Sequence, residues 1–216
     1  MNTVLGSGKM LFLGAHPDDI ESGAGGLLAR MSNEPGKHDC ICMVFSTTAE
    51  QPGNENILKE LKDSMRHAGL PESNLKVLDI PNTRFPENAH KIRRALEEVR
   101  DKWAPDIIVT HYLDNTHQDH KCLAEETVRV FRTHTILMYE DLKSTPRFVP
   151  NMTIALTDKE LDKKVRMMES YKSQFRRHYH DTEYLRSIAR MRGKRLGLDW
   201  GEAYHIYHMI VRRGND

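Results

Sequence analysis

Five apolar segments of strand length alternate with segments of helical periodicity up to residue 139. The strand-like runs follow Lys9 and Asp39 and recur at residues 75–80, 106–110 and 135–139. The helical segments between them cover residues 25–31, 57–68, 89–103 and 123–131. A chain that alternates strand and helix in this way forms a parallel sheet with helices on both faces. The pattern therefore predicts a Rossmann-like, mainly parallel α/β fold.

The pattern changes after Pro150. The sequence predicts a short strand, two charged helices and a closing strand, at residues 152–156, 158–173, 182–195 and 207–211. No Gly/Ser/Pro-rich linker separates this part from the rest, and 216 residues suit one domain. We expect a single domain over residues 1–216, with a core at about 9–140 and a C-terminal α/β elaboration at about 150–212.

Charge and hydropathy narrow the classes of partner. The chain has 32 Lys and Arg against 31 Asp and Glu, a net charge of +1, so no bulk charge favours nucleic acid or a membrane surface. No apolar run is long enough to span a bilayer, and the N-terminal residues lack the layout of a secretory signal. We expect a cytoplasmic protein that binds a small molecule and neither binds nucleic acid nor inserts into a membrane.

The three cysteines do not suggest a disulfide framework. Cys40 and Cys42 lie on one predicted strand and are expected to point to opposite faces, while Cys122 is distant in sequence. Disulfides are therefore not expected to stabilise this fold.

The first strand ends in a cluster of charged side chains. His16, Asp18 and Asp19 follow it directly, where doubly wound sheets bind ligands. Two adjacent carboxylates beside a histidine repel each other, and a cation relieves that repulsion most simply. The same turn, taken alone, also suits a capped helix entrance with an aspartate accepting backbone N–H bonds.

A second cluster follows the fourth strand and contains His111, His117, Asp119 and His120. In the common strand order 3-2-1-4-5, strands one and four are neighbours at the topological switch point. The two clusters are therefore expected to converge on one crevice. Neither cluster alone supplies a complete site, which favours a shared metal over a capped turn.

His16, Asp19 and His120 would form a set of two histidines and one carboxylate with open positions, as catalytic zinc sites require. Asp18 then remains as a general base for a metal-bound water. His117 is predicted to meet the developing oxyanion as an imidazolium, with Asp119 holding its ring.

The other histidines are predicted to be structural. His111 is expected to form hydrogen bonds at a strand end instead of binding a metal. The remaining candidates lack a suitable acidic companion and are predicted to be structural or surface groups: His178, His180, His205 and His208.

At these residues the sequence resembles the PIG-L/LmbE-like family of zinc-dependent N-acetylglucosaminyl deacetylases. The resemblance covers about residues 10–208 and rests on AHPDDIESGAGG, PDIIVTH, HQDH, Tyr139-Glu140, Pro150-Asn151 and Tyr171-Lys172-Ser173-Gln174. It implies a Rossmann-like fold, a zinc ion and hydrolysis of an N-acyl group, usually acetyl on glucosamine. The resemblance gives the residues named above the same roles: three zinc ligands, a general base, and an oxyanion partner with its supporting aspartate. The choice of Asp19 over Asp18 as the zinc ligand depends largely on the family. The resemblance also implies a homo-oligomer, a trimer or hexamer.

The chain departs from this family at two places. Ile20 stands where many relatives carry a glutamate, and Glu21 follows it. Ile57 stands where relatives often place a sugar-binding arginine. Arg84 is a candidate replacement near the mouth of the crevice, although a loop salt bridge explains it at least as well.

Two other functions remain open on sequence alone. A set of two histidines and one carboxylate also suits a non-haem iron oxygenase, and iron or cobalt could replace zinc. The crevice could also bind a sugar without catalysis. Neither the substrate nor the acyl group follows from the sequence.

Overall fold

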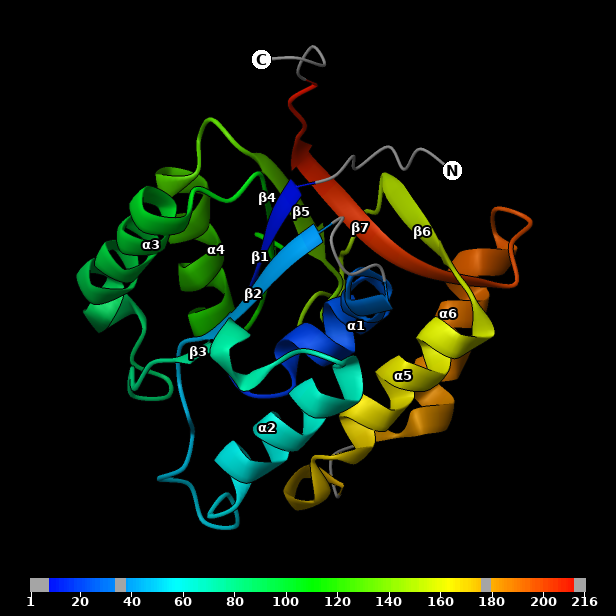
Figure 1. Cartoon of the computed structure of the whole chain (residues 1–216), viewed down its shortest axis with the longest axis horizontal. Helices are drawn as coiled ribbons and strands as arrows, with labels where there is room; N and C mark the ends of the chain where they lie inside the picture. Colours follow the sequence, from blue (N-terminus) through cyan, green and yellow to red (C-terminus); the bar gives the residue numbers. More distant parts are fainter. Residues whose placement is uncertain (1–7, 34–37, 176–179, 212–216) are drawn as a thin grey trace.

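The computed structural model describes residues 8–33, 38–175 and 180–211. Within these residues a seven-stranded sheet has the order β3-β2-β1-β4-β5-β7-β6 (Figure 1). Its strands are β1 (Gly8–Gly14), β2 (His38–Val44), β3 (Leu75–Val77), β4 (Ile107–His111), β5 (Thr135–Tyr139), β6 (Met152–Leu156) and β7 (Trp200–His208). The helices are α1 (Asp19–Asn33), α2 (Ile57–Ala68), α3 (Ala89–Trp103), α4 (Gln118–Val130), α5 (Asp158–Glu169) and α6 (Thr182–Lys194).

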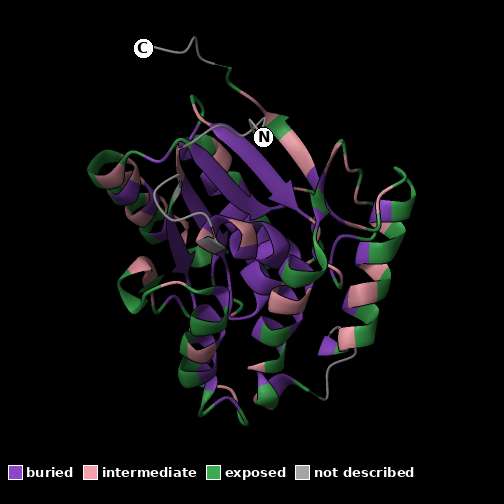
Figure 2. Ribbon diagram, turned by 45° about the vertical axis from the view of Figure 1, so that its right-hand side comes forward, coloured by how far each residue is buried: buried purple, intermediate pink, exposed green. Residues whose placement is uncertain are grey.

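The sheet buries both faces because its strands carry apolar side chains in both directions. On β1, Met10 and Phe12 contribute to one core cluster, whereas Leu11 and Leu13 contribute to the other. Residues of α1, α2 and α5 cover the first cluster, and residues of α3 and α4 cover the second. Figure 2 shows the buried sheet between helices whose outer surfaces are exposed. The predicted Rossmann-like α/β fold is confirmed.

The five N-terminal strands are parallel, and β1 lies between β2 and β4. The chain moves outward from β1 to β3 and then returns across the sheet to β4. The carboxyl ends of β1 and β4 therefore border the switch point that the sequence predicted. The C-terminal part extends the same sheet, since β7 pairs antiparallel with both β5 and β6.

Several boundaries differ from the sequence expectation. Helix α1 begins at Asp19 instead of residue 25, and α5 ends at Glu169 before a short 3-10 helix, η3 (Lys172–Gln174). The closing strand was expected at residues 207–211 but occupies Trp200–His208. Pairing of β7 with its neighbouring strands sets these bounds. Ala203 and Tyr204 are buried in the sheet, whereas Val211 lies beyond it and is 87% exposed.

The expectation for the cysteines was wrong in one respect. Cys40 and Cys42 both contribute to the core cluster beneath α1 and α2, because residues two apart on a strand share a face. All three cysteines are free and buried, so no disulfide stabilises the fold. None of the described helices is long and apolar enough to cross a membrane.

Candidate metal centre and active site

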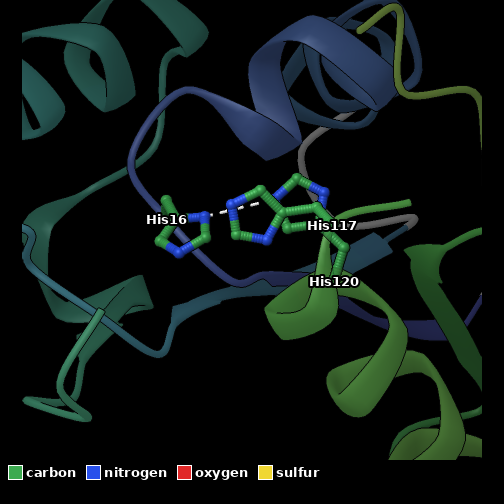
Figure 3. Close-up of side chains that lie close together, drawn as sticks. All are labelled: His16, His117 and His120. Carbon is green, nitrogen blue, oxygen red and sulfur yellow. Dashed lines mark hydrogen bonds between the residues drawn. The ribbon is translucent and has the colours of Figure 1, made fainter. Parts of the chain in front are cut away.

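Two loops far apart in sequence meet at the carboxyl ends of β1 and β4. His16 follows β1, and His120 lies in the first turn of α4. The Nδ1 atom of His16 is 3.1 Å from Nε2 of His120. Figure 3 shows these side chains lying close together, with a dashed line for the contact. Pairing of β1 with β4 brings these rings together.

Asp19 completes a compact triangle with these rings. Its Oδ2 atom lies 3.5 Å from Nδ1 of His16 and 3.4 Å from Nε2 of His120. Zinc binds such atoms at about 2.0–2.2 Å, which places neighbouring tetrahedral ligands about 3.3–3.6 Å apart. The two spacings to Asp19 fall in this range, and the His16–His120 spacing of 3.1 Å is slightly shorter, so the three predicted ligand atoms lie close to the arrangement that a tetrahedral cation needs. Burial alone would raise the pKa of Asp19, but His120 and His111 outweigh it and hold that pKa well below its usual range.

The His120 ring is oriented by a carboxylate that the sequence reasoning missed. Asp141 Oδ2 is 2.5 Å from His120 Nδ1, and Ser144 donates its hydroxyl to the same oxygen at 2.6 Å. Burial would raise the pKa of Asp141, but its bond to the His120 ring holds it well below the usual range. A carboxylate on the outer nitrogen of a histidine directs the other nitrogen toward a metal. Asp141 closely follows β5, which is the neighbour of β4 in the sheet. Its place at the carboxyl end of an adjacent strand is the sequence signal that could have identified it.

Asp119 contacts a different ring from the one expected. Its Oδ2 atom lies 3.1 Å from Nε2 of His16 and also accepts a bond from the Thr83 N–H at 2.7 Å. Burial alone would lower the pKa of His16, but Asp119 and Asp19 outweigh it and raise that pKa to about 9. The Asp119 carboxylate therefore orients His16 instead of His117.

His117 is held by the backbone of Asp119. The ring caps α4, with its Nδ1 atom accepting the Asp119 N–H at 3.2 Å. A neutral ring with a lone pair at Nδ1 carries its proton at Nε2. Burial, followed by the nearby His16, lowers the pKa of His117. The structure thus favours a neutral N–H donor at this position, not the imidazolium that the sequence suggested.

The adjacent aspartates have different partners. Asp19 accepts the His16 N–H at 2.7 Å and faces the histidine pair, while Asp18 lies 2.7 Å from Nε2 of His180. Asp18 has a φ of 86°, in the left-handed region of the backbone. This geometry supports Asp19 as the ligand and leaves Asp18 beside the pocket.

His111 also lies close to the cluster, since its Nε2 is 3.4 Å from Asp19 Oδ2. The same nitrogen accepts the Ala15 N–H at 3.1 Å. Burial, with a smaller effect of His120, lowers the pKa of His111 to about 4. A ring whose lone pair accepts a backbone bond is a hydrogen-bonding residue, as predicted, although its position would also allow it to join a metal group with Asp19 and His120.

A pocket of about 240 Å³ opens beside this cluster. Its wall consists of His16, Pro17, Asp18, Thr48, Gln51, Ile57, Asn82, Thr83, His117, Lys143 and Gln174. Arg84 does not line it, because its guanidinium bonds Glu87 at 2.8 Å and its side chain is 60% exposed. The contact with Glu87 is the loop salt bridge that the sequence offered as the alternative, and it favours that interpretation over a substrate contact.

His180 has an acidic partner that the sequence did not indicate. This ring is buried against Asp18, whereas His205 bonds the Val149 carbonyl away from the pocket, as expected of a structural residue. His178 falls outside the described residues. No sequence signal marked His180, because it lies 162 positions from Asp18.

The fold and the site together define a Rossmann-like α/β protein with a buried His/Asp cluster that could bind a metal ion at the sheet's switch point. The family model for PIG-L, described as GlcNAc-PI de-N-acetylase, matches residues 11–131, more than half of the chain. The chain belongs to this family of deacetylases.

The chain is also similar to individual proteins in sequence or in structure. The uncharacterized deacetylase YaiS of Escherichia coli K12 is 27% identical over 171 residues, covering 76% of this chain and 90% of that protein. The structure of N,N'-diacetylchitobiose deacetylase from Pyrococcus horikoshii is similar with a TM-score of 0.74 and 21% identity, covering 93% of this chain and 84% of the other. GalB, a 4-carboxy-2-hydroxymuconate hydratase from Pseudomonas putida, has a TM-score of 0.76 and 15% identity, covering 95% and 98%. These structural likenesses show the fold alone, which hosts more than one reaction.

Proposed function

We propose that this protein is a zinc-dependent hydrolase that removes an N-acyl group, most simply N-acetyl, from an amino sugar or an amino-sugar conjugate. The observation that carries the proposal is the ligand triangle of His16, Asp19 and His120, with the Asp18 carboxylate beside it in the pocket wall. Membership of a deacetylase family supports the same reaction.

The side chains around the pocket suit amide hydrolysis. A zinc ion bound by His16, Asp19 and His120 would polarise the amide carbonyl and lower the pKa of a water molecule. Asp18 takes a proton from the attacking water and later delivers it to the departing amine. His117 donates its Nε2–H to the oxygen that becomes negative in the tetrahedral intermediate. The C–N bond breaks as the amine leaves, and the acid and the amine are the products.

The remaining pocket wall suits a hydroxyl-rich substrate. Thr48, Gln51, Asn82 and Gln174 offer neutral hydrogen-bonding groups, whereas Ile57 contributes an apolar surface. Lys143 adds a cation to the wall and would tolerate an anionic substituent. We propose an amino sugar, free or conjugated, as the substrate class. Assembly as a homo-oligomer and a cytoplasmic location stay predictions.

The direct test is acid release from a panel of N-acetylated amino sugars, glycosides and sugar nucleotides, with the products identified by mass spectrometry. The protein is stripped of metal with a chelator and reloaded separately with zinc, iron(II) or cobalt(II). We expect release of acetate and a free amine, loss of activity on stripping and recovery with zinc. Oxygen consumption with iron(II) and no acid release would favour an oxygenase instead. Zinc-loaded protein that hydrolyses no member of the panel would favour a non-catalytic binding protein.

A further inference from the structure

The Asp18 carboxylate contacts His180, a buried residue of the C-terminal part of the chain. His180 lies between η3 and α6, outside the residues matched by the family model. Its Nε2 atom is 2.7 Å from Asp18 Oδ2, and its side chain is fully buried. His180 does not line the pocket, so it reaches the reaction only through Asp18.

The chemistry of this contact sets the direction of the hydrogen bond. As the base of the proposed reaction Asp18 starts as a carboxylate, which only accepts hydrogen bonds, so Nε2 of His180 is the donor in this contact. This bond engages Oδ2 and leaves Oδ1 as the oxygen that accepts the proton of water. A donor on one oxygen therefore selects the orientation in which the other oxygen works as a base.

The His180 ring is itself packed against a buried tyrosine. The ring of Tyr171 lies edge-on to it, with 6.1 Å between ring centroids. The Tyr171 hydroxyl donates to Glu21 Oε1 at 2.5 Å, and Ser64 donates to the same oxygen at 2.7 Å. His180 is thereby tied to α1 and α2 as well as to Asp18.

The backbone at Asp18 explains why such support is needed. Its φ of 86° lies in the left-handed region, which residues with a Cβ rarely adopt. A strained backbone of this kind persists only where surrounding contacts hold it. His180 provides the side-chain contact at this point.

We propose that His180 is a positioning residue that donates a hydrogen bond to Asp18 and holds this base toward the substrate pocket. The inference rests on the proposed hydrolase function, in which Asp18 acts as the base. The inference adds His180, a residue of the C-terminal part, to the proposed active site.

The kinetic test compares His180→Leu and His180→Gln in the wild-type and Asp18→Asn backgrounds. Glutamine keeps an N–H donor of similar reach, whereas leucine removes it. We expect His180→Leu to lower kcat by about 10-fold to 100-fold. KM should stay within about twofold, because substrate binding does not use this contact. His180→Gln should recover most of kcat.

The second background separates positioning from general damage. If His180 acts through Asp18, adding His180→Leu to Asp18→Asn lowers kcat by less than about twofold. His205→Leu is the control, since this histidine bonds the Val149 carbonyl away from Asp18. An equal loss in both backgrounds, or no recovery with glutamine, would overturn the inference.

Proton and nitrogen NMR of the imidazole rings tests the contact without any substrate. We expect His180 to show a protonated Nε2 with a strongly downfield proton, which moves upfield in Asp18→Ala. A signal unchanged by Asp18→Ala would refute the inference even in an active enzyme. If the signal responds but the panel shows no hydrolysis, the contact stands and the hydrolase proposal fails.

Discussion

At the scale of single residues, two adjacent aspartates have separate roles because they face different partners. Asp19 lies among the rings of His16, His111 and His120, while Asp18 turns toward His180 and the pocket. In the proposed function Asp19 is a metal ligand and Asp18 is the base, so substitution of each can separate the two roles.

We predict that Asp18→Asn keeps its zinc and lowers kcat by about 10² to 10⁴, the usual contribution of a positioned general base. Asp19→Ala should lose zinc as well as activity. Elemental analysis of the purified variants, together with acetate release, measures both effects. An Asp18→Asn enzyme with near-normal turnover would rule out Asp18 as the base.

His16 leads to a prediction about pH. Its pKa of about 9 in the metal-free protein means that the ring is protonated at neutral pH. A metal needs the lone pair at Nδ1, so binding must release that proton. Apparent zinc affinity should therefore rise by about tenfold per pH unit as pH increases toward 9, from this group alone.

Calorimetry in buffers of different ionisation enthalpy measures the released proton directly. Asp119→Asn is the matched variant, because it weakens the largest of the interactions that raise the pKa of His16. The apparent zinc affinity of this variant should depend less steeply on pH between neutral pH and pH 9. A pH-independent affinity in the wild-type protein would contradict the raised pKa.

At the scale of elements, the start of α1 depends on close packing against the sheet. Gly23 lies against the ring of Tyr139, and a Cβ at this position would come within 2.1 Å of that ring. The Tyr139 hydroxyl in turn donates to the Leu13 carbonyl at 2.9 Å, just before the site loop. The glycine therefore allows α1 to pack closely against the sheet next to the candidate metal centre.

We predict that Gly23→Ala lowers the free energy of unfolding by about 1–3 kcal/mol, as overpacking usually does. Gly25→Ala is the matched control on the same helix. Its added Cβ meets the Lys164 and Met167 side chains at 3.0–3.4 Å, and these flexible chains can shift. Urea unfolding of both variants measures the difference, and equal stabilities would show that the Tyr139 contact is relieved without cost.

At the scale of the whole molecule, the C-terminal part is tied to the core by a buried carboxylate. Glu202 of β7 accepts the backbone N–H groups of Gly26 and Leu27 in α1, each at 2.8 Å. It also pairs with Lys164 of α5 at 2.7 Å. Since β7 additionally pairs with β5, the two parts share one sheet and one core cluster.

We predict that both parts unfold in one transition. The chain has two tryptophans, Trp103 at the end of α3 and Trp200 at the start of β7. Fluorescence of Trp103→Phe and Trp200→Phe variants then reports each part separately in the metal-free protein. For each variant, the urea midpoint of the fluorescence change should equal the midpoint that circular dichroism gives for the same variant. Comparison within one variant removes any effect of the substitution on overall stability. Separate transitions would indicate two domains.

Local patterns in the sequence were sufficient for the fold class and for the convergence of the two clusters. Alternating periodicities report which segments form strands and helices, and parallel strands bring their carboxyl ends to one edge. The sequence alone therefore predicts that His16, Asp19 and His120 are neighbours. The family resemblance added the choice between the two aspartates.

Only the tertiary structure decided which side chain contacts which ring. Asp119 bonds His16 across 103 positions, and His180 reaches Asp18 across 162. Asp141 supports His120 from the next strand's loop, and Arg84 turns to Glu87 instead of the pocket. Sequence periodicity records how one element is buried, whereas these contacts depend on how several elements pack together, so no local pattern contains them.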